Sequence, residues 1–152
     1  MSETTVRPAP TGSREGRYWA YLGAAAAMPI VTSSVWYGAF AEVYSTLLAE
    51  RGIDLGDFRP EAWQMVGQLV RNGVVVVTIA TLVRKLRITR IGDALRLGLL
   101  LWLGFQAMAV VGSVLHERYP LGLYLIHVGD ALQATLVMAF LVAVASRPRG
   151  TS

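Results

Sequence analysis

Five polar residues interrupt stretches that are otherwise long and apolar: Arg71, Asn72, Gln106, His127 and Asp130. An ionisable side chain in the middle of a bilayer costs about 2.5–3.5 kcal/mol unless it is paired or hydrated. Counted at about 1.5 Å of rise per residue, Arg71, Gln106 and Asp130 each lie about nine residues from the same expected membrane surface. His127 shares a helix face with Asp130, because residues three apart are neighbours on a helix. These positions predict an intramembrane polar cluster in which Arg71 pairs with Asp130, assisted by Asn72 and Gln106.

Such a cluster has three interpretations. It can be a structural knot between helices, or a site for conduction or for a substrate. In the third interpretation Arg71 reaches outward from a span that begins nearer Gly67, and Asp130 is protonated or bonded to a hydroxyl of the first span. His127 could titrate near neutral pH, although a histidine that donates to a backbone carbonyl between packed helices is the commoner case.

Catalytic chemistry finds little support in the sequence. The only other polar trio with a histidine is His116, Glu117 and Arg118, which loop charge explains. No Gly-rich phosphate loop, HExxH pattern or Gly-x-Ser-x-Gly elbow occurs. The acidic loop 50–61 lacks the ligand spacing of a calcium loop, and the chain has no cysteine. We therefore expect no catalytic residue, no metal and no cofactor.

The elements that position the polar residues are four apolar blocks, at about 18–40, 63–83, 95–115 and 121–145. The chain is 54% hydrophobic with a mean hydropathy of +0.47, and a bilayer core about 30 Å thick needs roughly 20 apolar helical residues. The sequence thus predicts an all-α integral membrane four-helix bundle as one domain over 18–145. Residues 1–17 are expected to be a disordered tail, with a cleavable signal peptide as the rival, and 146–152 a second tail.

The basic residues indicate the orientation of the bundle. They gather before the first block, between the second and third blocks, and after the fourth: Arg7, Arg14, Arg17, Arg84, Lys85, Arg87, Arg90, Arg147 and Arg149. The positive-inside rule then predicts that both termini are cytoplasmic, in the inner (plasma) membrane. This placement explains the net charge of +4 by the orientation of the chain, so we expect no nucleic-acid partner. The lipid bilayer is the expected partner.

Aromatic and small residues complete the prediction for the helices. Aromatic side chains at the ends of the blocks are typical of the membrane interface: Trp19, Trp36, Tyr37, Trp63, Tyr119 and Tyr124. Pro29 predicts a kink in the first span. In the fourth span Ala131, Thr135, Ala139 and Ala143 recur every four residues, and such a ridge lets another helix approach closely. We expect it to be a packing face through which the protein forms a homo-oligomer.

Three stretches also resemble a known family. Trp36-Tyr37 followed by Gly38-Ala39-Phe40, the run 98–105 (GLLLWLGF) and the opening of the fourth span at 121–129 are together similar to the bacterial membrane family called domain of unknown function 1761. The resemblance covers about 18–145 and implies four spans and no established activity. This chain departs from the family pattern, which has serine and proline at Gly38 and Ala39, an acid or amide at His127 and an aromatic at Asp130.

The leading functional interpretation is a small multi-pass membrane protein with a structural or accessory role. The alternative is a small oligomeric channel or transporter with Asp130 and His127 on its pathway. An enzyme acting on lipid or prenyl substrates, with His116 or Glu117 beside a lipid cleft, comes third. A dry, fully paired cluster would favour the first interpretation, and water reaching Asp130 would favour the second.

Overall fold

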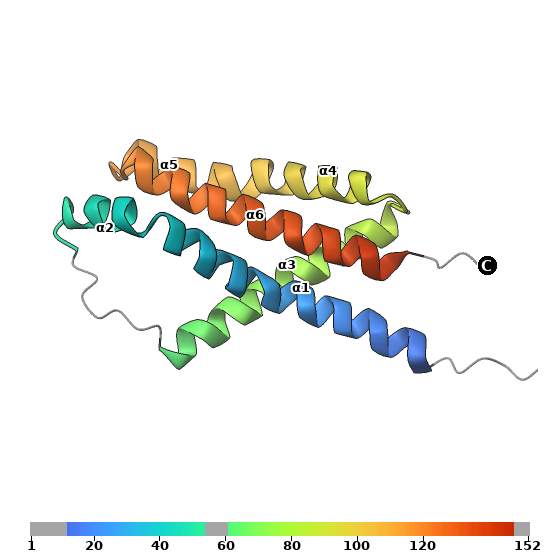
Figure 1. Ribbon diagram of the computed structural model, residues 1–152. Helices are drawn as coiled ribbons and strands as arrows, with labels where there is room; N and C mark the ends of the chain where they lie inside the picture. Colours follow the sequence, from blue (N-terminus) through green and yellow to red (C-terminus); the bar gives the residue numbers. More distant parts are fainter. Residues whose placement is uncertain (1–11, 54–60, 148–152) are drawn as a thin grey trace, which may run out of the picture.

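The computed structural model describes residues 12–53 and 61–147, and all regular structure in these ranges is helical (Figure 1). In chain order the elements are α1 (Gly12–Ala39), α2 (Ala41–Ala49), α3 (Ala62–Lys85), α4 (Ile91–Leu101), the π-helix η1 (Trp102–Ala107), α5 (Met108–His116) and α6 (Leu121–Ser146). The predicted all-α fold is confirmed. Helix α1 begins at Gly12, so residues 12–17 are helical and not part of a disordered tail; residues 1–11 and 148–152 lie outside the described ranges.

Helix α6 is the centre of the fold, because it packs against α1, α2, α3, α4, η1 and α5. Figure 1 shows α1 along one side of α6, the row α4–η1–α5 along the other, and α3 crossing obliquely. The turns that end α3 and α5 are short, since Arg87 and Arg118 adopt left-handed backbone conformations with φ of 52° and 53°. After the second turn Pro120 precedes the first residue of α6, where its fixed φ suits a helix start.

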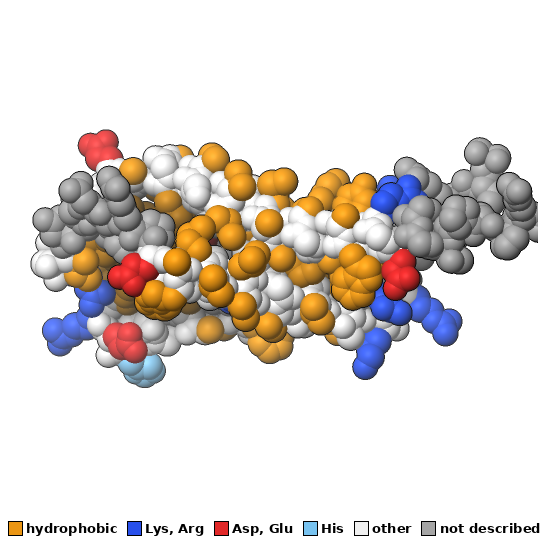
Figure 2. All heavy atoms as spheres, turned by 90° about the horizontal axis from the view of Figure 1, so that it is seen from below, with side chains coloured by type: hydrophobic (Ala, Val, Ile, Leu, Met, Phe, Trp, Pro, Cys, Tyr) orange, Lys and Arg blue, Asp and Glu red, His pale blue; other side chains and the backbone are white. Residues whose placement is uncertain are grey.

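Three stretches among the described residues are long and apolar enough to cross a membrane: Ala62–Lys85, Ile91–His116 and Leu121–Ser146. The pair α1 and α2 makes a fourth if it counts as one span, with a bend of 72° between its two helices. Figure 2 shows hydrophobic side chains along the body and charged side chains gathered toward its two ends. This distribution is compatible with a helical membrane protein.

The core is concentrated in one half of the molecule. Its buried residues come from α1, α3, α4 and α6: Leu22, Ala25, Val76, Ile79, Ala80, Val83, Ala94, Met138, Ala139, Val142 and Ala143. These residues lie toward the α3–α4 turn, which is the end that carries Arg84, Lys85, Arg87 and Arg90. A cavity extends from this core, where Ile79 and Met138 line it, toward the bend between α1 and α2, where Tyr37 and His127 line it.

The third apolar block differs from its prediction as one regular α-helix. It begins at Ile91 and ends at His116, but a π-helix over Trp102–Ala107 interrupts it. A π-turn closes i to i+5 hydrogen bonds and occurs most often as a short bulge inside an α-helix, frequently at functional sites. Here the indole Nε1 of Trp102 donates to the Val128 carbonyl of α6 at 2.8 Å, which fixes the start of η1 against the central helix.

Candidate functional site

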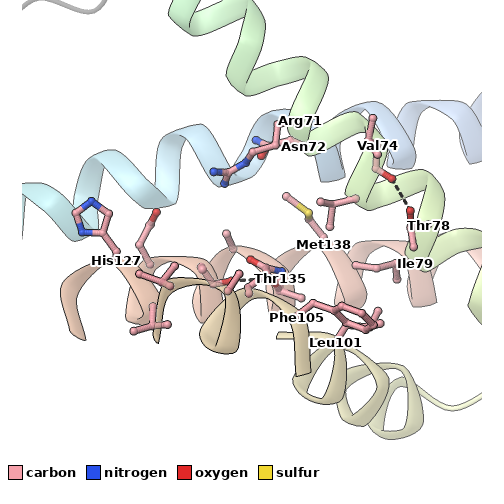
Figure 3. A pocket seen from close by; sticks show the side chains of 18 of the residues that line it. Arg71, Asn72, Val74, Thr78, Ile79, Leu101, Phe105, His127, Thr135 and Met138 are labelled. Carbon is pink, nitrogen blue, oxygen red and sulfur yellow. Dashed lines mark hydrogen bonds between the residues drawn. The ribbon is translucent and has the colours of Figure 1, made fainter. Parts of the chain in front are cut away.

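A cavity of about 690 Å³ lies between α1, α3, the row α4–η1–α5, and α6 (Figure 3). Helix α3 packs on α1 and α6, and the row α4–η1–α5 packs on α6. All five residues of the predicted polar cluster line it, together with Tyr37. The remaining lining is almost entirely apolar: Val74, Val75, Thr78, Ile79, Leu82, Leu101, Phe105, Ala109, Val110, Val128, Ala131, Ala134, Thr135 and Met138.

Arg71 and Asp130 share this cavity but do not form the predicted ion pair. Across residues 12–53 and 61–147 the one side-chain ion pair is Arg96 with Asp93, at 3.2 Å. The Asp130 Oδ1 instead accepts a hydrogen bond from Gln133 Nε2 at 2.9 Å, and the Asp130 residue is 9% exposed. Arg71 is exposed, and Figure 3 shows its side chain reaching from α3 into the space between the helices. The accessible charge of the cavity is therefore the guanidinium.

Asn72 joins α3 to α1 directly beside Arg71. Its Nδ2 donates to the Ala26 carbonyl at 3.0 Å, and the residue is fully buried. Ala26 follows Ala25, whose carbonyl lacks its helical donor because Pro29 has no amide hydrogen. Helix α1 nonetheless continues through Pro29. The Asn72 Oδ1 is buried without a hydrogen-bond partner among the described residues, which costs about 1–3 kcal/mol. Asn72 thus fixes the helix crossing that presents Arg71.

Gln106 is held on the opposite wall by the π-helix. Its Nε2 donates to Thr135 Oγ1 at 2.8 Å, and that hydroxyl donates in turn to the Ala131 carbonyl at 2.7 Å. Gln106 therefore connects η1 to α6 and does not contact Arg71 through a hydrogen bond.

His127 lies in a cluster of three tyrosines that the sequence did not predict. Its ring centroid is about 6 Å from those of Tyr37 on α1, Tyr44 on α2 and Tyr119 in the turn before α6. The His127 Nδ1 is 2.8 Å from the Leu123 carbonyl, one turn back on its own helix. Spacing alone could not show this cluster, because its members come from three separate elements.

Tyr119 is the member of this cluster outside the helices. Burial raises the pKa of its hydroxyl above the usual value of 10, Tyr44 adds to the rise, and the nearby Arg51 opposes it. The Arg51 guanidinium lies over the Tyr119 ring, 5.5 Å from its centroid. The Tyr119 phenol is therefore neutral at physiological pH.

The predicted interface aromatics divide into two groups. Trp19 and Trp63 are exposed, near the ends of α1 and α3. Trp36, Tyr37, Tyr119 and Tyr124 face inward in part, and the Trp36 Nε1 donates to the Ile126 carbonyl at 3.0 Å. The Tyr124 hydroxyl is 3.4 Å from the Ala107 carbonyl. The second group contributes to helix packing around the cavity.

The small-residue ridge of α6 is occupied within the chain. A Cβ placed on Gly98 of α4 would lie 3.0 Å from the Ala139 Cβ and 3.8 Å from the Thr135 Cγ2. Thr135, Ala139 and Ala143 are all buried. Part of the ridge therefore packs on α4 of the same chain, whereas Ala131 is half-buried and lines the cavity. The expected homo-oligomer stays a prediction.

The residues of the alternative enzymatic site lie apart from the cavity. His116, Glu117 and Arg118 are exposed at the end of α5, and none of them lines the cavity. Within the described ranges no three His, Asp or Glu side chains lie close enough to hold a metal ion. Asp54 and Asp57 of the acidic loop fall outside the described residues.

Comparison with known proteins supports the resemblance seen in the sequence. A family model described as "Protein of unknown function (DUF1761)" matches residues 19–143. No protein with a curated description and no solved structure matches the chain.

Proposed function

We propose that this chain, which belongs to the DUF1761 family of proteins of unknown function, is a multi-pass inner-membrane protein that binds a small amphiphilic ligand in the cavity beside α6. The observation that carries this proposal is the exposed Arg71 guanidinium in a cavity whose walls are otherwise mostly apolar. Ligand sites in proteins have this composition, with few polar groups on an apolar wall, and volumes of about 300–1,000 Å³.

The cavity distinguishes ligand binding from the two interpretations that the sequence favoured. A purely structural knot would have its charges paired and its interior filled, whereas Arg71 has no ion-pair partner among the described residues. A conducting pore would need an opening at both ends of the bundle. The close-packed core around Val83, Ala94 and Val142, which do not line the cavity, argues against such a pore through one copy. A cavity bounded by this core is better suited to holding a ligand than to conducting ions.

We place both termini and the Arg84–Arg90 turn in the cytoplasm, since this end of the bundle carries the excess of basic residues. The chain has no cysteine, so single cysteines can report the orientation. In intact cells a membrane-impermeant thiol reagent should label Glu117→Cys, while Lys85→Cys should react only after permeabilisation. Lys85 is the last residue of α3, Glu117 directly follows α5, and both are exposed. The reverse pattern would overturn the orientation, and labelling of both variants in intact cells would overturn the spanning arrangement.

The binding proposal is tested by filling the cavity. Ala109 is exposed and lines it, so Ala109→Trp should occupy ligand space without disturbing the core. Binding of tritium-labelled dodecyl phosphate and tritium-labelled dodecanol to the purified protein is measured by scintillation proximity. We expect at least one of these probes to bind the wild type, and its affinity for Ala109→Trp to fall about tenfold, because overpacking costs about 1–3 kcal/mol and about 1.4 kcal/mol is a factor of ten.

The matched control is Met108→Trp, the neighbouring position, which is 51% exposed and does not line the cavity. This variant should bind the probes like the wild type. If neither probe binds the wild type, or if both tryptophan variants bind equally, the cavity is not a ligand site and a structural role becomes the better explanation.

A further inference from the structure

We infer that the ligand is a single-chain amphiphile with an acidic, phosphate-like headgroup that binds Arg71, and with a tail that lies between α3 and the row α4–η1. This inference rests on the proposed function and specifies its ligand class. It follows from which charge the cavity exposes and from how its polar and apolar residues are arranged along α3.

Three side chains that face the cavity can carry charge: Arg71, His127 and Asp130. Asp130 is 9% exposed and its Oδ1 is occupied by Gln133. His127 is half-buried among Tyr37, Tyr44 and Tyr119, with Nδ1 bonded to a backbone carbonyl. Arg71 is exposed, and its guanidinium presents a planar set of N–H donors that matches phosphate and carboxylate groups. The charged group that a ligand can reach in this cavity is therefore the Arg71 guanidinium.

The apolar part of the cavity continues from Arg71 along α3 in one direction. Val74, Thr78 and Leu82 follow at helical spacing on the lining face, and the last is eleven residues from Arg71, or roughly 16 Å along the helix. The Thr78 hydroxyl donates to the Val74 carbonyl at 2.9 Å (Figure 3), so its hydrogen-bonding capacity is used within its own helix. An elongated apolar wall with a charge at one end fits a chain with a headgroup.

The opposite wall of the cavity belongs to the row α4–η1. Leu101 and Phe105 line the cavity, and Phe105 is 71% exposed. Figure 3 shows both side chains at the far side of the cavity from Arg71. A tail lying between α3 and this row would contact the apolar side chains of both.

The test compares amphiphiles that share one chain length and differ in their headgroup. Tritium-labelled dodecyl phosphate is bound to the purified wild type and displaced with unlabelled dodecyl phosphate, dodecanol, dodecyltrimethylammonium or inorganic phosphate. We expect dodecyl phosphate to displace the label at a concentration about tenfold or more below that of dodecanol and of the cationic probe, because a hydrogen bond to a charged group is worth this factor. Inorganic phosphate should not displace the label, because it lacks the tail.

Substitution of Arg71 then locates the headgroup. Arg71→Gln should lose the preference for dodecyl phosphate over dodecanol, and Arg71→Lys should keep part of it. Arg84→Gln removes a charge from an exposed position on the same helix that does not line the cavity, so it should leave the preference unchanged. Thermal unfolding of each variant in the same detergent shows that the fold is retained.

Two results would overturn the inference while leaving the proposed function intact. One is equal displacement by all three amphiphiles with no effect of Arg71→Gln, provided that Ala109→Trp still abolishes binding. The other is preferential binding of dodecyltrimethylammonium, which would assign the headgroup to Asp130. If inorganic phosphate displaces the label at a concentration similar to that of dodecyl phosphate, the ligand is a free anion and not an amphiphile.

Discussion

Replacing Gly129 by alanine should lower the free energy of unfolding by about 1–3 kcal/mol, although alanine is the better helix former by about 1 kcal/mol. A Cβ at this position would lie 2.5 Å from Cζ2 and 3.0 Å from Cη2 of Trp36. The indole is anchored by the hydrogen bond from its Nε1 to the Ile126 carbonyl. It cannot tilt away without losing that bond, so helices α1 and α6 would have to separate.

Thermal unfolding in detergent measures this effect, and two other glycines provide controls. A Cβ on Gly112 meets nothing within 4 Å, so Gly112→Ala should be neutral or slightly stabilising. On Gly122 it would lie 2.7 Å from Cδ1 of Leu47, the end of a flexible side chain, so Gly122→Ala should cost less than Gly129→Ala. In the Trp36→Leu background Gly129→Ala should lose most of its effect. An equal loss in both backgrounds would show that the indole is not the obstacle.

Replacing Gly98 by leucine should cost about 3 kcal/mol, at the upper end of overpacking effects. The added Cβ alone would lie 3.0 Å from the Ala139 Cβ and 3.6 Å from the Thr135 carbonyl oxygen, and the larger side chain would force α4 off the ridge of α6. The position lies in the packed half of the molecule, which leaves no room for relaxation. The midpoint of thermal unfolding should fall accordingly.

The matched control is Gly92→Leu in the first turn of α4, where a Cβ meets nothing within 4 Å. This variant should unfold within a few degrees of the wild type. If Gly92→Leu and Gly98→Leu lower the midpoint equally, the loss comes from the glycine-to-leucine change itself and not from contact with Ala139.

The extents of the helices could be predicted from the sequence because an apolar run long enough to cross a bilayer is typical of a spanning helix and of little else. The predicted block 63–83 corresponds to α3 at Ala62–Lys85, and the block 121–145 corresponds to α6 at Leu121–Ser146. The predicted polar residues all line one cavity, since their depths follow from the helical rise and the helix ends. Depth along a helix axis is a local property of the sequence.

The pairing of these residues could not be predicted from the sequence in the same way. Arg71 and Asp130 lie at similar depth, but an ion pair also requires a short lateral distance, which depends on the crossing of α3 over α6. That crossing is fixed by contacts between distant segments, such as Asn72 with the Ala26 carbonyl. The tyrosines around His127 were missed for the same reason, because the 72° bend between α1 and α2 turns Tyr44 back toward α6.

The π-helix at Trp102–Ala107 has a consequence for comparing members of the family. A π-turn contains one residue more than an α-turn, so a homologue that lacks one residue here would have a regular α-helix. Beyond the deletion its side chains would be rotated by about 100° around the helix, and the residue aligned with Gln106 would no longer face Thr135. A single-residue gap in this segment would therefore divide the family into members that share this cavity wall and members that do not, even where the aligned residue types agree.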